Sequence, residues 1–146
     1  MNYGVLLALH LLAAMAFAGT VFFEVVMLEG VRKKLTHETM RALEHAIGNR
    51  ATAVMPWVLL TLYATGVGLA WQHRAALSQA MNSSFGLLLS LKIALALSVF
   101  GHFVTAMVWR WHGVLSGRRS RRLHLSVFYH VLVIVLLAKA MFHLRW

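Results

Sequence analysis

The chain has 146 residues, of which 60% are hydrophobic and only 12% are charged, and its mean hydropathy is +0.72. Soluble domains carry about 25% charged residues, so this composition excludes water as the main solvent of the surface. The net charge of +10 would suit nucleic acid if the basic residues gathered on a polar surface. They lie instead mostly in two short stretches between apolar runs, which indicates a membrane protein and argues against nucleic acid as a partner. The absence of cysteine excludes disulfides and thiolate metal sites.

Four apolar segments follow one another along the chain, each near the length of about 20 residues that crosses a hydrocarbon core of about 30 Å. They cover approximately residues 3–28, 53–71, 85–109 and 125–142. Only helices and closed barrels satisfy the backbone in lipid, and these segments are too long for barrel strands and lack alternation. The sequence therefore predicts an all-α fold, a transmembrane four-helix bundle, with residues 1–146 as a single membrane domain.

The first segment contains the stretch AMAFAG, which resembles the cleavage site of a secretory signal peptide. No Lys or Arg precedes this stretch, and the apolar run continues well beyond it, so we expect an uncleaved first span. His10, Phe17 and Glu24 are seven residues apart in it. This heptad spacing keeps the three side chains near one face of the helix, which would be turned into the bundle.

The connections between the segments predict the orientation. The first, residues 29–52, carries five basic residues and three glutamates, and its stretch MRALEHAIGNR predicts a short amphipathic helix at the membrane interface. The second has one arginine, and the third, residues 110–122, has five. Basic connections face the cytoplasm, so we expect a bacterial-type cytoplasmic (inner) membrane protein with both termini outside. Pro56 is expected at the start of the second span, where its missing N–H does little harm.

Ionisable side chains inside the spans are candidates for function, because burying them in lipid is unfavourable. At about 1.5 Å per residue they form two layers. The outer layer contains His10, Lys92, Lys139 and His143, and the inner layer contains His102, His130 and Glu24. The lysines have an alternative explanation, since they can snorkel to the outer surface. His10 also has one, because it can bond a neighbouring helix.

His102 and His130 lie on consecutive antiparallel segments at similar depth. Two imidazoles in such positions suit one haem iron or one copper ion, since neutral imidazole is a good ligand for both metals. Arginines at the cytoplasmic edge, such as Arg118 and Arg119, would then bind the haem propionates through charge-assisted hydrogen bonds.

The chain resembles the CopD-like superfamily of small membrane proteins, which includes the HemJ-type protoporphyrinogen oxidases. The resemblance rests on LLALHLLAAMAFAG, on LLSLKIALALSVFGHFVTAMVWRW, on RRSRR and on the late lysine of VLLAKAMF. It places His10, Lys92 and His102 on the polar positions of the superfamily and implies haem b or copper as the ligand. The HemJ type usually has an arginine-bearing stretch late in its first helix, where this chain has TVFFEVVMLEG. The resemblance therefore favours the CopD-like architecture over protoporphyrinogen oxidation.

Three hypotheses follow from the sequence. The first is a haem b protein for electron transfer or redox chemistry, with His102 and His130, or His10 and one of them, as axial ligands. The second is a copper transport or resistance protein, in which His10, Met15, His102 and His130 offer sites across the membrane. The third is a structural or assembly subunit without a cofactor. The candidate partners are the lipid bilayer, a redox protein or quinone, and further copies of the chain.

Overall fold

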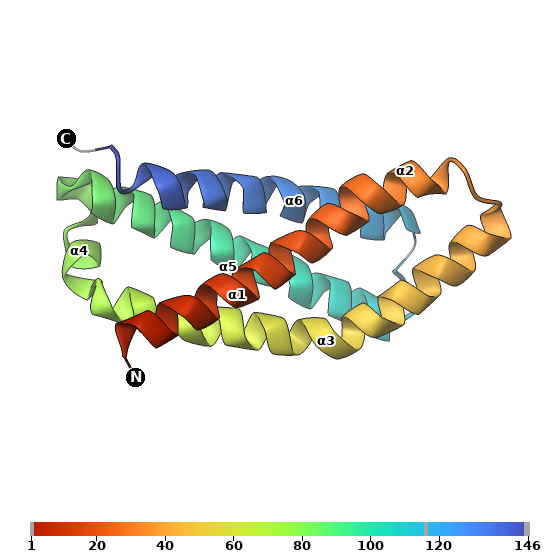
Figure 1. The fold of residues 1–146 in the computed structure, drawn as a ribbon, viewed down its shortest axis with the longest axis horizontal. Coiled ribbons are helices and arrows are strands. Elements are labelled where there is room, and N and C mark those ends of the chain that lie inside the picture. Colours follow the sequence, from red (N-terminus) through yellow and green to blue (C-terminus); the bar gives the residue numbers. More distant parts are fainter. Residues whose placement is uncertain (1, 116, 145–146) are drawn as a thin grey trace. The chain divides into compact units, whose positions relative to one another are not determined.

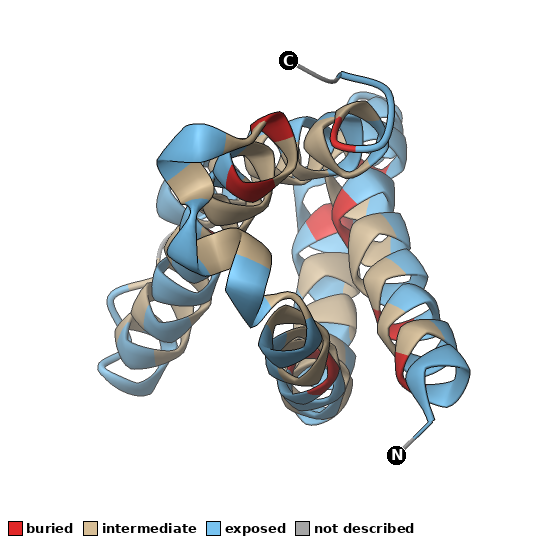
Figure 2. Cartoon of the chain, turned by 90° about the vertical axis from the view of Figure 1, so that its left-hand side faces the viewer, coloured by how far each residue is buried: buried red, intermediate tan, exposed pale blue. Residues whose placement is uncertain are grey.

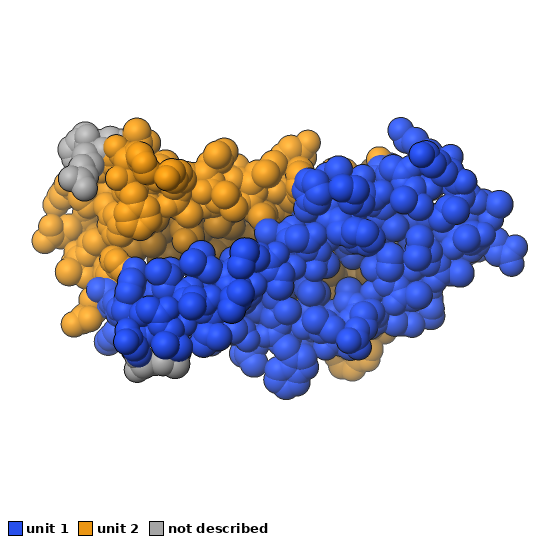
Figure 3. Space-filling model, viewed as in Figure 1, with its two compact units in different colours: residues 1–72 blue, residues 73–146 orange. Residues whose placement is uncertain are grey.

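The computed structural model describes residues 2–115 and 117–144, and all regular structure in these ranges is helical (Figure 1). Four helical segments are long and apolar enough to cross a membrane, namely Tyr3–Arg32, His37–Gln72, Ser84–Trp111 and Gly117–Ala140. The predicted all-α transmembrane fold with four spans is therefore confirmed. The chain forms two compact units, Met1–Gln72 and His73–Trp146, which Figure 3 shows in different colours.

The first unit is an antiparallel pair of long helical segments. The first segment joins three elements without a break: α1 (Tyr3–Phe22), the π-helix η1 (Phe23–Leu28) and α2 (Glu29–Arg32). It extends four residues beyond the predicted span, because polar residues continue the helix past the apolar run. The second segment is α3 (His37–Gln72). Gly68 of α3 lies against Leu6 of α1, and a Cβ atom at position 68 would come within 2.8 Å of the leucine side chain.

Helix α3 is much longer than the span predicted for it. Residues 53–71 form only its second half, and the stretch MRALEHAIGNR belongs to its first half instead of forming a separate interfacial helix. Pro56 lies inside the helix, where it removes the N–H that would bond the carbonyl of Thr52. The expectation that Pro56 opens a helix is therefore wrong. The helix continues through it because the preceding residues are mostly good helix formers, such as Ala, Leu, Glu and Arg.

The second unit starts with two short helices, α4 (Arg74–Ser78) and the 3₁₀-helix η2 (Ala80–Asn82). The long helices α5 (Ser84–Trp111) and α6 (Gly117–Ala140) follow and pack against each other in antiparallel orientation (Figure 1). The Ser83 hydroxyl caps α5 by accepting the N–H of Gly86 at 3.1 Å. A Cβ atom on Gly86 would overlap the carbonyl oxygen of Ala76, so the short helices can dock on α5 only at a glycine.

The surface of both units is apolar to an extent that suits lipid. The buried apolar residues are few: Leu6, Ala13, Val21, Leu28, Met40, Leu59, Val99, Val127 and Met141. Figure 2 shows that exposed and half-buried residues cover most of the long helices. Large side chains such as Trp57 and Leu136 are 70% and 68% exposed. Contact between these helices and a lipid bilayer explains why so little of the apolar surface is buried within the chain.

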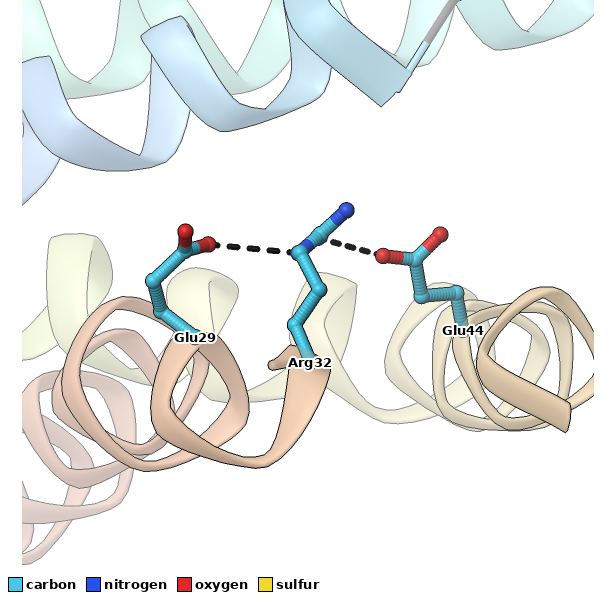
Figure 4. A network of polar contacts seen from close by, with 3 residues as sticks. All are labelled: Glu29, Arg32 and Glu44. Atoms are coloured by element: carbon cyan, nitrogen blue, oxygen red, sulfur yellow. Dashed lines mark ion pairs between the residues drawn. The ribbon is translucent and has the colours of Figure 1, made fainter. Parts of the chain in front are cut away.

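A charged cluster joins the two segments of the first unit at the end opposite the N-terminus. The Arg32 guanidinium lies between two carboxylates, with Nε 3.2 Å from Oε2 of Glu29 and Nη2 paired with Glu44 of α3 (Figure 4). Glutamates of the first connection therefore neutralise one of its basic residues within the unit itself.

Candidate metal centre

His102 of α5 and His130 of α6 face each other in the second unit, as their positions in the sequence predict. Their ring centroids are 5.2 Å apart and the ring planes are inclined by 57°. Both rings are half-buried. The two imidazoles therefore share one small polar region in an otherwise apolar helix pair.

The backbone fixes the tautomer of each ring. His102 Nδ1 lies 2.7 Å from the carbonyl oxygen of Ser98, and His130 Nδ1 lies 2.8 Å from that of Ser126. A carbonyl oxygen can only accept a hydrogen bond, so Nδ1 must carry the proton in both rings. In the neutral form each Nε2 then holds a lone pair, so Nε2 is the atom available to accept a proton or bind a metal.

Two serine hydroxyls reach across between the helices to these Nε2 atoms. The Ser126 hydroxyl donates to His102 Nε2 at 2.9 Å, and the Ser98 hydroxyl donates to His130 Nε2 at 3.1 Å. Each helix thus supplies one serine and one histidine, and the four residues form a closed cycle of hydrogen bonds. We call Ser98, His102, Ser126 and His130 the Ser–His ring.

A repeated pentapeptide produces this ring. Helix α5 contains SVFGH at residues 98–102, and α6 contains SVFYH at residues 126–130. Residues four apart share a helix face, and two copies of the pattern on antiparallel helices bring each serine opposite the histidine of the other copy. Val99 and Val127, the second residues of the two copies, are both buried, with 3% and 7% of their surfaces exposed. The ring therefore has approximate local two-fold symmetry.

The serines were not among the residues predicted for the site. The signal that would have identified them is the repeat itself, in which serine and histidine recur at the same spacing in two apolar segments.

The ring lies near the middle of both helices. The midpoint between Ser98 and His102 is about 24 Å from the start of α5, and that between Ser126 and His130 is about 17 Å from the start of α6, at about 1.5 Å per residue. These positions are about 17 Å from the end of α5 and about 18 Å from the end of α6. Because Arg118, Arg121 and Arg122 occupy the first turns of α6, its apolar part begins only after them, and the midpoint between Ser126 and His130 lies about 9 Å along the helix from Arg122.

His10 lies in the first unit and has a comparable environment. Its Nδ1 is 3.1 Å from the carbonyl oxygen of Leu62 and 3.1 Å from the hydroxyl of Thr65. Thr65 is buried, and its hydroxyl donates to the carbonyl of Thr61 at 2.6 Å. His10 Nδ1 therefore carries the proton here too. A Cβ atom on Gly66 would come within 3.2 Å of His10 Cε1, so the absence of a side chain there makes room for the ring.

The other predicted site residues lie away from the Ser–His ring. Lys92 is half-buried on α5, about 15 Å along the helix from His102. Arg118 is exposed at the start of α6, and the Arg119 side chain donates to the carbonyl of Val114 at 2.9 Å and lies over the Trp109 ring. The two arginines are about 17 Å along α6 from His130.

Three polar residues of the predicted layers complete the description. Lys139 and His143 are exposed, and His143 Nδ1 donates to the carbonyl of Lys139 at 3.1 Å. Glu24 is half-buried in the π-helix η1, which the sequence did not predict. Single π-helical turns within longer helices are frequent at functional sites.

The Ser–His ring supplies two imidazole nitrogens and two hydroxyl oxygens. In residues 2–115 and 117–144, no group of three or more His, Cys, Asp or Glu side chains is placed to hold a metal ion. Any ion at the ring would therefore have two strong protein ligands, with hydroxyl groups as weaker neighbours. Such a site suits loose binding more than permanent retention of a metal.

Comparison of the chain with models of known protein families, with curated proteins and with solved structures finds no match.

Proposed function

We propose that this chain is a multi-pass membrane protein that binds a copper ion through the Nε2 atoms of His102 and His130. The observation that carries this proposal is the facing pair of imidazoles, each already oriented by a bond from Nδ1–H to a backbone carbonyl. Histidines that bind metals almost always donate their other ring N–H to a carbonyl or carboxylate, which fixes the tautomer and the ring orientation. Imidazole is a suitable ligand for copper.

The groups that would be displaced by an ion at the ring have other hydrogen-bonding partners within reach. The two Nδ1–H bonds can stay in place while the serine hydroxyls rotate away from Nε2. A serine in a helix can bond the carbonyl four residues earlier, so each displaced hydroxyl has a new acceptor on its own helix. The hydroxyls thus satisfy the imidazoles in this structure and would have other acceptors if His102 and His130 held an ion.

A copper ion suits the ring geometry better than a haem held between the two histidines. The ring centroids are 5.2 Å apart, so both imidazoles are close enough to contribute to one small site. In addition, Ser98 and Ser126 join α5 directly to α6 at this level, whereas a porphyrin between the rings would have to separate the helices.

Loose binding by two ligands is the property that a transport or handling site needs, because the ion must both enter and leave. Copper handling also agrees with the resemblance to CopD-like proteins. In the proposed orientation both termini face outward, and the connections at residues 29–52 and 110–122, with five basic residues each, face the cytoplasm of a bacterial-type inner membrane.

Haem b remains the second candidate. The observation in its favour is that His10, His102 and His130 all carry their proton on Nδ1, so that Nε2 is the ligand atom. In this case one histidine of the ring would hold the haem, and the chemistry that the haem would supply is electron transfer.

The experiment that tests the proposal is visible absorption of the full chain purified in detergent after expression with haem available, together with metal analysis after the purified chain has been equilibrated with copper. We expect about one copper per chain and no Soret band. A Soret band that His102→Ala or His130→Ala abolishes would favour haem b instead. Protein that contains neither cofactor, or that retains copper equally in both variants, would contradict the proposal and favour a subunit in which the ring only joins helices.

A further inference from the structure

The third connection differs from the first in its net charge and not in its number of basic residues. Residues 29–52 and 110–122 contain five basic residues each, so both satisfy the rule for cytoplasmic loops equally well. That rule counts Lys and Arg and is almost insensitive to acidic residues. The two connections differ in their carboxylates: residues 29–52 include three glutamates, whereas residues 73–146 contain no Asp or Glu at all. The formal charges are therefore +2 and +5, with histidine neutral.

Three of the five arginines of the third connection are also arranged on one helix face. Arg118, Arg121 and Arg122 are exposed in the first two turns of α6. Their spacings of three and four residues make them neighbours on the helix surface. Like charges at these spacings destabilise a helix, so this end of α6 is suited to bind an anion that lies over all three. We call these three residues the arginine face.

Its neighbours show where the arginine face lies relative to the membrane. Trp109 and the exposed Trp111 end α5, and tryptophan is enriched at the level of the lipid headgroups. The Arg119 guanidinium lies 5.5 Å from the centroid of the Trp109 ring, which links the start of α6 to this level. Guanidinium groups bind phosphate through paired hydrogen bonds.

We propose that the arginine face binds the phosphate headgroups of anionic phospholipids. Clusters of basic residues directly on the cytoplasmic side of a transmembrane helix are recognised as sites for anionic lipids. The first connection does not offer an equivalent site, because Glu29 and Glu44 engage Arg32 there (Figure 4). The consequence is a selective annulus of acidic lipid around the second unit at one end of α6.

The test compares lipid retained by the full chain after purification in equimolar mixed micelles of phosphatidylglycerol and phosphatidylcholine with the same acyl chains. Native mass spectrometry gives the ratio of the two bound lipids. Each basic residue near a membrane surface contributes up to about a fivefold preference for an anionic lipid. Because the arginine face has three such residues, we expect wild-type protein to retain phosphatidylglycerol at least several-fold over phosphatidylcholine. The R118Q/R121Q/R122Q variant should lose most of this preference.

Two control variants keep the result interpretable. K33Q/K34Q/R41Q removes three charges from the first connection and should keep the wild-type preference. R118K/R121K/R122K preserves the charges and the orientation, and it should keep at least half of the preference. The membrane orientation of each variant is checked by adding Ser78→Cys and labelling its thiol, which is the only one in a chain without other cysteines.

Three results would overturn the proposal. The first is a wild-type ratio of bound phosphatidylglycerol to phosphatidylcholine near one. The second is a loss of preference in K33Q/K34Q/R41Q, or in R118K/R121K/R122K, as large as the loss in R118Q/R121Q/R122Q. The third is displacement of phosphatidylglycerol by about 10 mM inorganic phosphate, which would indicate a site for small anions instead of a lipid site.

Discussion

The hydrogen bonds that cross between α5 and α6 predict which pairs of residues stabilise the second unit together. Replacing Ser98 by alanine removes the donor to His130 Nε2, and replacing His130 by alanine removes the acceptor. A double-mutant cycle on this pair isolates their interaction. Hydrogen bonds between membrane helices contribute about 0.6 kcal/mol on average and up to about 1.7 kcal/mol. The ring is closed and half-buried, so we expect a coupling of about 1 kcal/mol.

The same four residues provide the control. His102 bonds the backbone carbonyl of Ser98, and alanine at position 98 retains that carbonyl. The pair Ser98 and His102 should therefore show a coupling below about 0.5 kcal/mol. Because of the local symmetry, the cycle for Ser126 and His102 should match the one for Ser98 and His130.

The assay is equilibrium unfolding of the purified chain by sodium dodecyl sulfate in mixed micelles, with a chelator present so that bound metal does not add to stability. The free energy of unfolding is measured for wild type, for each single variant and for each double variant. Equal couplings within a helix and across helices, or no coupling across helices, would refute the hydrogen-bonding pattern described for the ring.

Three other predictions concern stability and use the same unfolding assay. Gly86→Ala should destabilise the chain by about 1–3 kcal/mol, since its Cβ would overlap the Ala76 carbonyl. As a control, the Cβ of Gly101→Ala on the same helix meets nothing within 4 Å, so this change should be neutral or slightly stabilising. Equal losses of stability in the two variants would contradict the packing described for Gly86. Thr65→Val removes one partner of His10 Nδ1 and should destabilise by at most about 1 kcal/mol, because the Leu62 carbonyl still accepts; a larger loss would mean that the hydroxyl, not the carbonyl, is the main acceptor. Arg32→Gln should destabilise by no more than about 1 kcal/mol, and the difference should shrink at about 1 M salt, since its side chain is 39% exposed; an effect that is independent of salt would argue against an ionic contribution.

The four spans could be predicted from sequence because apolar length is a direct requirement of the bilayer. The continuity of α3 could not be predicted. The amphipathic stretch before Pro56 and the span after it differ in composition, which suggests two separate helices, although both have a high helical preference. A proline inside a helix is tolerated in membrane proteins, where neighbouring groups compensate the freed carbonyl. The π-helix around Glu24 leaves no recognisable pattern in the sequence, since it changes the hydrogen bonding and not the residue types.

The pairing of His102 with His130 could also be predicted, because antiparallel neighbours at equal depth must meet. Their serine partners were missed, since a serine in an apolar helix normally bonds a carbonyl of its own helix and attracts no attention. The serines reach the histidines only in the observed register between α5 and α6. The sequence indicates this register through the SVF stretch that comes before each histidine, and the repeat is visible only when the two segments are compared.

The central claim, that the two facing imidazoles form one copper site, is tested most directly by titrating the purified chain with Cu(I) against a competing chelator under reducing conditions. The account predicts one site per chain, lost in His102→Ala and equally in His130→Ala, and retained when the exposed His37 and His45 of α3 are both replaced by alanine. No measurable Cu(I) binding by wild type, or the same site in the His102 and His130 variants, would contradict it.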